Sequence, residues 1–316
     1  MNKRRLGHTD IRISPLVLGG NVFGWTADKR TSFEILDRYA EAGFETLDTA
    51  DVYSKWAPGN RGGESEAIIG EWMESRGNRD RTIVITKVGG EFSPTEKGLS
   101  AGYIERAVEA SLRRLRTDRI DVYLSHWPDA SVPYEETLGA YQRLVAAGKV
   151  RAIGASNHDA GQLRAALNAA ERNKLPRYEV LQPEYNLFDR SGYDGALRDL
   201  ALSEGIGVVT YYSLAKGFLS GKYRSAADLG KSPRGHGVKG YLNERGTRIL
   251  GALDRVSEQH AAAPAEAALA WLIARPGVTA PIASATSLAQ LESLIRAASL
   301  QLSAEDVALL DEASRY

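Results

Sequence analysis

Eight short apolar segments, rich in β-branched residues, recur along the chain and alternate with longer amphipathic segments. The eight segments are residues 15–19, 44–50, 82–88, 120–127, 150–156, 178–185, 206–214 and 279–285. Their apolar character is nearly continuous, which is typical of parallel strands that are buried on both faces. The pattern therefore predicts eight strands of a parallel sheet.

The segments between these runs have the apolar spacing of helices. In residues 101–119, Ile104, Val108, Leu112 and Leu115 recur at intervals of three or four positions, which places them on one helix face. Residues 160–174 and 263–277 show similar spacing. Glycines that follow helical segments and precede strands predict C-terminal helix caps. They are Gly43, Gly148, Gly205 and Gly277.

Eight strand–helix units in this length predict an α/β fold, a (β/α)8 TIM barrel that forms one domain over residues 1–316. A doubly wound sheet is the alternative. It normally has fewer strands and a G-x-G-x-x-G loop after the first one, and the glycines of residues 18–25 lack this spacing. The barrel is therefore favoured.

Three segments lie outside the eight units. We expect residues 4–14 to form an N-terminal hairpin that closes the bottom of the barrel. Residues 221–246 are rich in Gly, Lys and Arg and poor in core residues, which predicts a long functional loop after the seventh strand. Residues 303–316 predict a C-terminal helix with Ser303 as its N-cap.

Charge and composition narrow the classes of partner. Lys plus Arg number 40 and so do Asp plus Glu, which gives no electrostatic reason to expect nucleic acid or an anionic membrane. There is no cysteine, so disulfides and thiolate metal sites are excluded. The apolar runs at 16–18 and 261–274 are too short for a signal peptide core and a membrane span. We expect a soluble cytoplasmic protein without a metal.

Polar residues at the C-terminal ends of the strands are the candidates for chemistry, because the active site of a (β/α)8 barrel lies there. Asp48, Asp51 and Tyr53 follow the second predicted strand, Lys87 ends the third, and His126 ends the fourth. Each has an ordinary structural interpretation alone, such as a solvated lysine or a packed tyrosine. A barrel brings all of them to one rim, which favours a shared function.

Asp48, Tyr53, Lys87 and His126 have a coherent chemistry. A tyrosine with a pKa of about 10 is a poor proton donor at neutral pH, and a nearby ammonium lowers that pKa. A carboxylate keeps the ammonium in place, and a histidine orients a carbonyl by a hydrogen bond. The group predicts a general acid aimed at a carbonyl oxygen, as carbonyl reduction requires beside a hydride source. Asp51 has no role in this scheme and is interpreted as a loop cap.

Six motifs spread along the chain resemble those of the aldo-keto reductase superfamily. They are FETLDTADVY, GESEAIIGEWM, TIVITKVGG, YLSHWPD, IGASNH and LQPEYNLFDR. The most similar group is the bacterial reductases that resemble potassium-channel β-subunits. The resemblance implies an NAD(P)H-dependent oxidoreductase that reduces aldehydes or ketones to alcohols. In it Tyr53 is the proton donor, Lys87 and Asp48 tune its acidity, and His126 positions the substrate carbonyl.

The resemblance also implies a nicotinamide cofactor site without a doubly wound domain. Ser156, Asn157 and Gln182 hold the carboxamide, and Tyr211 stacks below the nicotinamide ring. The segment 213–223 covers the pyrophosphate, with contacts from Ser213, Leu214, Gly217, Leu219 and Lys222. One departure is local: the usual YSPL reads YYSL, so Tyr212 and Ser213 replace Ser and Pro.

A second departure concerns the 2′-phosphate of NADP. Many relatives place Arg or Lys just after the eighth strand, whereas this chain has Ser284, Thr286, Ser287 and Gln290. Hydroxyls and helix N-terminal amides can hold a phosphate, and Lys222, Arg224 and Lys231 are the candidate cations from the loop. We expect NADPH, with NADH as the alternative.

Three tryptophans that follow strand ends predict a substrate pocket. They are Trp25, Trp56 and Trp127, and they suit small-molecule aldehydes or ketones with apolar bodies. Two other functions stay open: an aldolase that uses Lys87 as a Schiff-base amine, and a nicotinamide-cofactor-binding sensor or regulatory subunit with little turnover. The pattern favours no particular substrate, direction of reaction or oligomeric state.

Overall fold

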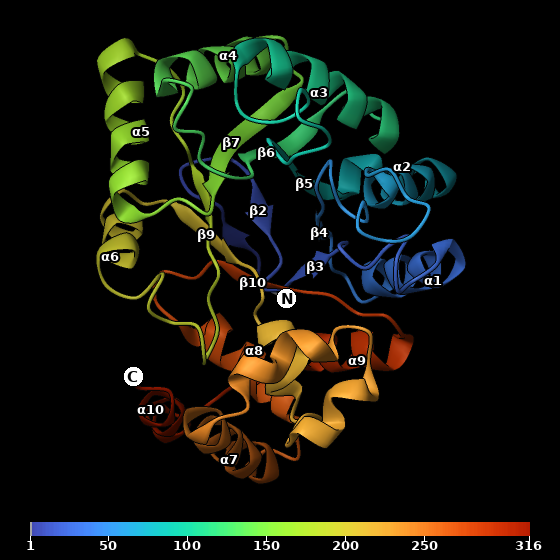
Figure 1. Cartoon of the computed structure of the whole chain (residues 1–316), viewed down its shortest axis with the longest axis vertical. Coiled ribbons are helices and arrows are strands. Elements are labelled where there is room, and N and C mark those ends of the chain that lie inside the picture. Colours follow the sequence, from blue (N-terminus) through green and yellow to red (C-terminus); the bar gives the residue numbers. More distant parts are fainter. Residues whose placement is uncertain (1) are drawn as a thin grey trace.

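The computed structural model describes residues 2–316 and has a closed barrel of parallel strands at its centre (Figure 1). The barrel strands are β3 (Val17–Gly19), β4 (Thr46–Asp48), β5 (Ile83–Val88), β6 (Ile120–Ser125), β7 (Val150–Ser156), β8 (Val180–Gln182), β9 (Gly207–Thr210) and β10 (Ala280–Ala283). They are hydrogen-bonded in sequence order, and β10 pairs with β3 to close the ring. Each of the eight apolar segments contains one of these strands, so the predicted (β/α)8 barrel is confirmed.

Helices surround the barrel. They are α1 (Lys29–Glu41), α2 (Glu64–Arg76), α3 (Ala101–Leu115), α4 (Tyr134–Ala146), α5 (Ala160–Asn173), α6 (Ala196–Ser203), α7 (Glu244–Gln259), α8 (Pro264–Ala274), α9 (Leu288–Ala297) and α10 (Ala304–Ala313). Helices α1 to α8 lie between successive strands, and α9 and α10 follow the last strand. The predicted cap glycines all have positive φ; Gly43 after α1 has a φ of 84°, a conformation that costs glycine little. Ser303 caps α10 as predicted, and it forms a capping box with Asp306.

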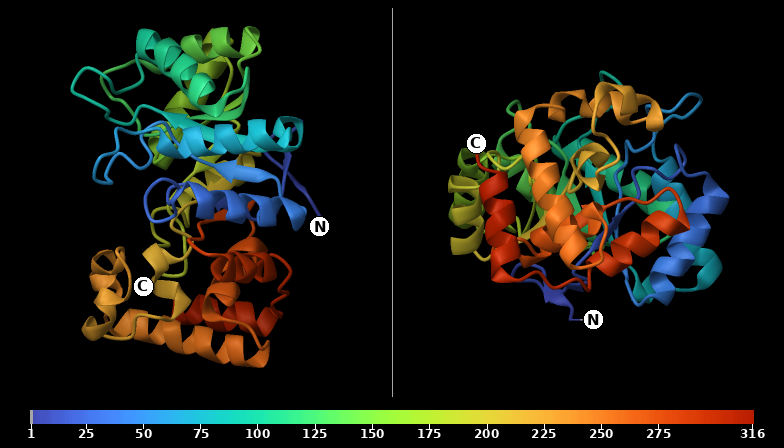
Figure 2. Two further views of the ribbon diagram at one scale, coloured as in Figure 1. Left: turned by 90° about the vertical axis from the view of Figure 1, so that its right-hand side faces the viewer. Right: turned by 90° about the horizontal axis from the view of Figure 1, so that it is seen from below.

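The N-terminal hairpin closes one end of the barrel. It consists of β1 (Arg4–Arg5) and β2 (Arg12–Ile13), which pair antiparallel. Leu6, Ile11 and Ile13 are buried and pack in one cluster with the residues that fill the barrel interior. In the left view of Figure 2 the N-terminus lies on one side of the molecule, and the loops after β4 and β5 extend from the opposite side. The prediction that the hairpin closes the bottom is therefore confirmed.

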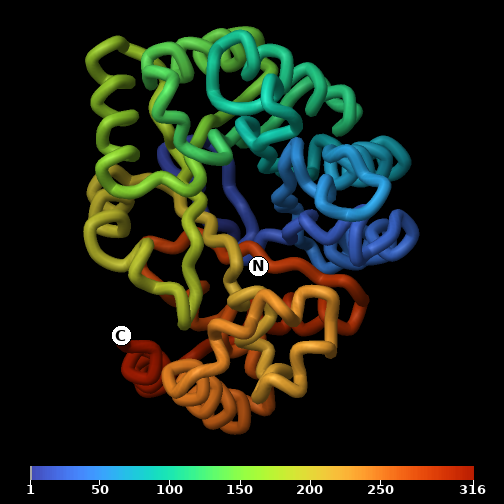
Figure 3. The backbone as a smooth tube through the Cα atoms, viewed as in Figure 1, coloured from blue at the N-terminus to red at the C-terminus, as the bar shows by residue number. Residues whose placement is uncertain are grey.

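The long segment after β9 has more structure than the sequence predicts. It contains three 3-10 helices, η2 (Ala215–Ser220), η3 (Ala226–Lys231) and η4 (Gly235–Tyr241), whereas a fourth, η1 (Arg79–Arg81), precedes β5. The rings of Phe218 and Tyr241 stack at 5.4 Å between centroids, and Val238 is fully buried. The predicted long segment after the seventh strand is confirmed, and the structure adds that its few apolar residues pack together. Figure 3 follows this excursion in yellow and orange beside α8.

No helix within residues 2–316 has both the length and the apolar character needed to cross a lipid bilayer.

Candidate active site

The ammonium of Lys87 is the centre of a polar cluster at the C-terminal ends of β4 and β5. Its Nζ lies 2.8 Å and 2.9 Å from the two carboxylate oxygens of Asp48. It also donates to the carbonyl oxygen of Thr49 at 2.8 Å and to Tyr53 Oη at 2.9 Å. The side chain of Lys87 is fully buried, and that of Asp48 is 3% exposed. The cluster therefore joins a proton-bearing phenol to a buried ion pair.

Local chain geometry explains why Asp48 and Tyr53 meet Lys87. Asp48 is the last residue of β4 and pairs in register with Ile85, two residues before Lys87 on the neighbouring strand. The chain then turns, with the N–H of Tyr53 bonded to the carbonyl of Ala50 at 3.2 Å. This turn returns the phenol over the end of β5.

His126 follows the last residue of β6 and lies beside Tyr53. Its backbone N–H donates to the carbonyl of Val88 at 2.8 Å, and the two ring centroids are 6.0 Å apart. Burial, with a smaller contribution from the charge of Lys87, lowers the pKa of His126 to about 3. The imidazole is therefore neutral at physiological pH and has one ring N–H to donate.

Burial also governs the acidity of Tyr53 and Lys87. It raises the pKa of Tyr53 well above its ordinary value, and the negative charge of Asp48 raises it further. This direction is opposite to the lowered pKa expected from the sequence, because desolvation and the charge of Asp48 both disfavour the phenolate. Burial lowers the pKa of Lys87, while Asp48 opposes this shift. Tyr53 holds its proton at neutral pH.

The residues expected to hold the nicotinamide form a chain of hydrogen bonds across the next strand ends. Ser156 donates to the carbonyl of Gln182 at 2.8 Å. Asn157 donates to the carbonyl of His126 at 2.8 Å and accepts from Tyr211 Oη at 2.7 Å. The side-chain amide of Gln182 donates to Asp48 at 2.8 Å. The structure therefore places the side chains of Ser156, Asn157, Gln182 and Tyr211 beside the polar cluster. The side-chain amide of Gln182 points towards Asp48.

The expected pyrophosphate segment passes through η2. Ser213 and Leu219 are buried, Leu214 and Gly217 are partly exposed, and Lys222 is exposed. Tyr212, Ala215 and Lys216 have φ values of 50°, 47° and 58°, which are rare for residues other than glycine. Three of the eight non-glycine residues with positive φ in residues 2–316 therefore lie in this loop.

The polar residues after β10 bond to their own neighbours. The hydroxyl of Ser284 donates to the side chain of Asn21, and the backbone N–H and hydroxyl of Thr286 donate to Gln290. Ser287 is the N-cap of α9. These four residues lie at or just before the N-terminal end of α9, and within residues 2–316 none of them forms a hydrogen bond with the Lys87 cluster.

The three tryptophans flank the Tyr53–His126 pair. Trp25 and Trp56 meet edge to face at 5.7 Å, and Trp56 lies 6.0 Å from the ring of Tyr53. The ring of Trp127 stacks with that of His126 at 5.9 Å. Trp56 and Trp127 are about half exposed, at 50% and 53%. An aromatic rim therefore borders the polar cluster on two sides.

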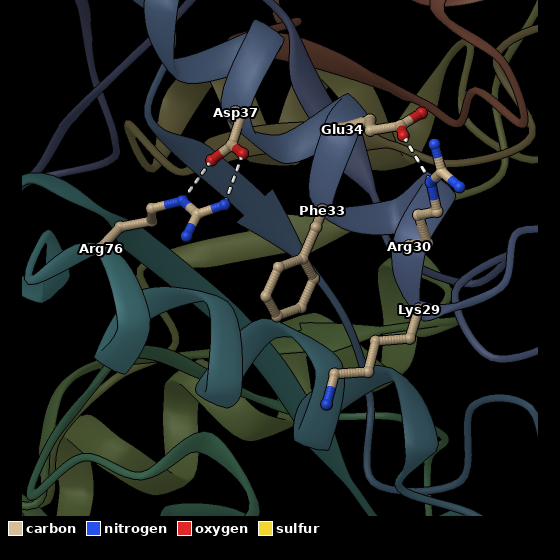
Figure 4. Close-up of a pocket in the computed structure, with 6 residues that line it drawn as sticks. All are labelled: Lys29, Arg30, Phe33, Glu34, Asp37 and Arg76. Carbon is tan, nitrogen blue, oxygen red and sulfur yellow. Dashed lines mark hydrogen bonds and ion pairs between the residues drawn. The ribbon is translucent and has the colours of Figure 1, made fainter.

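A hollow on the outer face, between α1 and α2, is separate from this site (Figure 4). There the ring of Phe33 lies between Lys29 and Arg76, and Arg76 pairs with Asp37 at 2.8 Å. None of the candidate residues lines it.

Comparison with known proteins decides the family. The sequence profile of the Aldo/keto reductase family matches residues 15–315. The chain belongs to the aldo/keto reductase family. This reductase is 34% identical to the oxidoreductase YrpG of Bacillus subtilis, over 97% of this chain and 94% of that protein. It is 31% identical to the aldo-keto reductase YhdN of the same organism, over 94% and 87%.

The relatives also include a probable voltage-gated potassium channel subunit beta of Arabidopsis thaliana, which is 33% identical over 94% of this chain and 91% of that protein. The predicted likeness to such subunits is confirmed. The protein is an NAD(P)H-dependent aldo/keto reductase of the class that acts on small carbonyl compounds. Membership of this family favours reduction over the aldolase alternative.

Sequence reasoning missed one charged residue of the excursion after β9. Arg234 is partly buried and has no carboxylate within ion-pair distance in residues 2–316. Arg224 and Lys231, which the sequence suggested as phosphate ligands, are paired with Asp254 and Asp228, each at 2.7 Å. Arg234 differs from Arg224 and Lys231 because it has no ion pair within residues 2–316. The pattern of apolar and polar positions in the sequence does not predict which cations form ion pairs.

Proposed function

We propose that this reductase converts aldehydes or ketones to alcohols, with Tyr53 as the proton donor and NADPH as the preferred cofactor. The observation that carries the proposal is the position of Lys87. Its Nζ contacts Tyr53 Oη at 2.9 Å while both oxygens of Asp48 hold it from the other side. This arrangement supplies a proton and a fixed positive charge at one point.

When bound, a nicotinamide cofactor would supply the hydride that the carbonyl carbon needs. The phenol of Tyr53 donates its proton to the carbonyl oxygen, and the ammonium of Lys87 stabilises the phenolate that remains. Asp48 keeps that ammonium charged and directed at Tyr53. The neutral ring of His126 donates a hydrogen bond to the same oxygen and orients the substrate. The aromatic rim of Trp25, Trp56 and Trp127 contacts the apolar body of the substrate.

The residues of the described chain suit a nicotinamide dinucleotide. Ser156, Asn157 and Tyr211 surround the polar cluster with amide and hydroxyl groups. Non-glycine residues with positive φ in the 212–217 loop represent strain of the kind that accumulates at ligand sites. We assign the nicotinamide to the former group and the pyrophosphate to this loop, with Ser213, Leu214, Gly217 and Leu219 along it.

The preference for NADPH rests on cations that lack a partner. Lys222 and Arg234 form no ion pair in the part of the chain that the structure describes, whereas Arg224 and Lys231 each have a carboxylate. An unpaired cation binds a phosphate without first breaking a salt bridge. We therefore assign the 2′-phosphate to Lys222 and Arg234 together with the α9 N-terminus at Ser287, and NADH is the weaker alternative.

Tyr53→Phe tests the proton donor. The variant keeps the ring and removes the hydroxyl, so kcat for para-nitrobenzaldehyde with NADPH should fall by about a hundredfold or more. The dissociation constant for NADPH, measured by fluorescence titration, should stay within about twofold. Tyr134→Phe on α4 is the matched control and should retain turnover. Equal turnover in Tyr53→Phe would remove Tyr53 from the role of donor.

A sensor or regulatory subunit with little turnover is the second candidate. The likeness to a probable potassium channel subunit favours it. Multiple-turnover oxidation of NADPH with a panel of aldehydes and ketones distinguishes the two. A single round of oxidation per chain, without further turnover, would support the sensor.

A further inference from the structure

A second polar cluster lies behind β5, between the barrel and helices α2 and α3. Its centre is the carboxylate of Glu66, which is fully buried. Glu66 accepts a hydrogen bond from the hydroxyl of Thr86 at 2.6 Å and one from the guanidinium of Arg114 at 2.7 Å. Every oxygen of this carboxylate therefore has a partner.

Asp51 lies beside this cluster without any such partner. It belongs to the turn between Asp48 and Tyr53, and its backbone N–H donates to the carbonyl of Lys87 at 3.3 Å. The residue is 1% exposed, and neither carboxyl oxygen has a hydrogen-bond partner within residues 2–316. The interpretation of Asp51 as a loop cap stays a prediction.

The charges around Asp51 are already balanced. The charged and titratable groups that face it are Glu66 on α2, Tyr103 and Arg114 on α3, Lys87 on β5, Tyr123 on β6 and Tyr141 on α4. Lys87 is paired with Asp48 and Arg114 with Glu66. An ionised Asp51 would be a third carboxylate against two cations. Burying a charge is strongly unfavourable unless hydrogen bonds and a counter-ion of its own compensate for the loss of water.

The acidity of the group agrees with this geometry. Burial raises the pKa of Asp51 well above its ordinary value, and the charge of Glu66 raises it further. Arg114, the N–H of Val52 and Lys87 act in the opposite direction without reversing the shift.

We propose that the folded protein holds Asp51 as a neutral carboxylic acid behind Lys87, so that the ammonium of Lys87 is balanced by Asp48 alone. Asp51 is then a positioning residue that acts through Lys87. This role rests on the proposed function, because an additional negative charge beside Lys87 would oppose formation of the Tyr53 phenolate. The protonation state itself does not depend on that function.

Proton uptake on folding tests the protonation state without any substrate. The unfolded chain ionises Asp51 at a pKa of about 3.9, whereas the native state keeps the proton. Wild type should therefore lose stability relative to Asp51→Asn as the pH rises from 5 towards 8. The ratio of the two folding constants should change by about tenfold per pH unit up to the native pKa.

Urea unfolding of the full chain measures this ratio. Asp118→Asn is the matched control, since the side chain of Asp118 is 90% exposed, and its stability curve should run parallel to that of wild type. A parallel curve for Asp51→Asn as well would overturn the proposal.

Infrared spectroscopy of wild type keeps the proposal testable if Asp51→Asn does not fold. At pH 7 the full chain should show the C=O stretch of a protonated carboxyl that shifts when the aspartate carboxyl carbons are isotopically labelled. Burial also raises the pKa of Glu184, but the band of a glutamic acid does not shift with the aspartate label. Absence of an aspartic acid band at pH 7 would overturn the proposal.

The pH dependence of turnover tests the role towards Lys87. With para-nitrobenzaldehyde and NADPH, the alkaline fall in kcat should occur at higher pH in Asp51→Asn, which cannot acquire the extra charge. If kcat falls at the same alkaline pH in wild type and in Asp51→Asn, Asp51 has no positioning role. Loss of reduction in wild type itself would instead count against the proposed function, and the folding and infrared results would still decide the state of Asp51.

Discussion

Lys87 is fully buried, yet its ammonium contacts a carboxylate, a carbonyl and a phenol within 2.9 Å. Isolated burial of such a charge would be costly, so the pair with Asp48 must persist for the fold to tolerate it. Burial also lowers the pKa of His126 and raises that of Tyr53. At the scale of single residues, desolvation therefore favours the neutral forms of His126 and Tyr53.

The acid stability of the protein should reflect the neutral His126. Its pKa is 6.5 ordinarily and about 3 in the folded state, so the unfolded chain binds the extra proton between these values. Stability should therefore fall as the pH decreases from 6.5 towards 3, by up to about 2 kcal/mol at pH 5 from this residue. Urea unfolding at several pH values measures the slope, and His126→Gln should make it shallower. An unchanged slope in the variant would contradict the assignment.

Among the elements, the excursion from η2 to η4 differs most from its sequence-based description. Its apolar residues form a small stack of Phe218 and Tyr241, which gives the loop a defined conformation. Within residues 2–316, that conformation leaves Lys222 and Arg234 without an ion pair and pairs Arg224 with Asp254. The excursion therefore leaves Lys222 and Arg234 available to bind an anion.

Arg234→Met should weaken NADPH binding more than NADH binding, because only NADPH has the 2′-phosphate. We expect a change of about tenfold in the ratio of the two dissociation constants, or about 1.4 kcal/mol. Fluorescence titration with both cofactors measures it. Arg224→Met removes an already paired cation and should leave the ratio unchanged. An equal effect of the two variants would show that ion pairing does not select the phosphate ligand.

At the scale of the whole molecule, the apolar cluster at the bottom of the barrel and the candidate active site lie at opposite ends of the strands. The hairpin of β1 and β2 fills the bottom with Leu6, Ile11 and Ile13, and the polar cluster lies at the opposite strand ends. A defect at the bottom should therefore destabilise the fold without reshaping the site.

Leu6→Ala tests this separation. Leu6 is fully buried, so the truncation should lower the free energy of unfolding by about 2 to 5 kcal/mol. The KM for para-nitrobenzaldehyde should stay within about twofold at a temperature where the variant is folded. A large rise in KM would show that the two ends of the barrel are coupled.

Much of the fold could be predicted because hydrophobic pattern and strand order are local properties of the chain. All eight apolar segments contain a barrel strand, and the ends of β4, β5 and β6 carry Asp48, Tyr53, Lys87 and His126. The prediction that one domain spans residues 1–316, and the roles assigned to the site residues, stay predictions. The order inside the 221–246 segment was missed because its few apolar residues lack a helix or strand period.

The sequence by itself determined the barrel, the family and the rim on which the polar residues meet. The reason is that the spacing of apolar residues and the order of the motifs are properties of the sequence alone. The tertiary structure decided which charges have partners. Among residues 2–316, it gave Lys87 and Glu66 their counter-ions, left Asp51 buried without one, and paired Arg224 but not Arg234. These outcomes depend on distances between segments far apart in the chain and on the exclusion of water, and neither can be read from residue order.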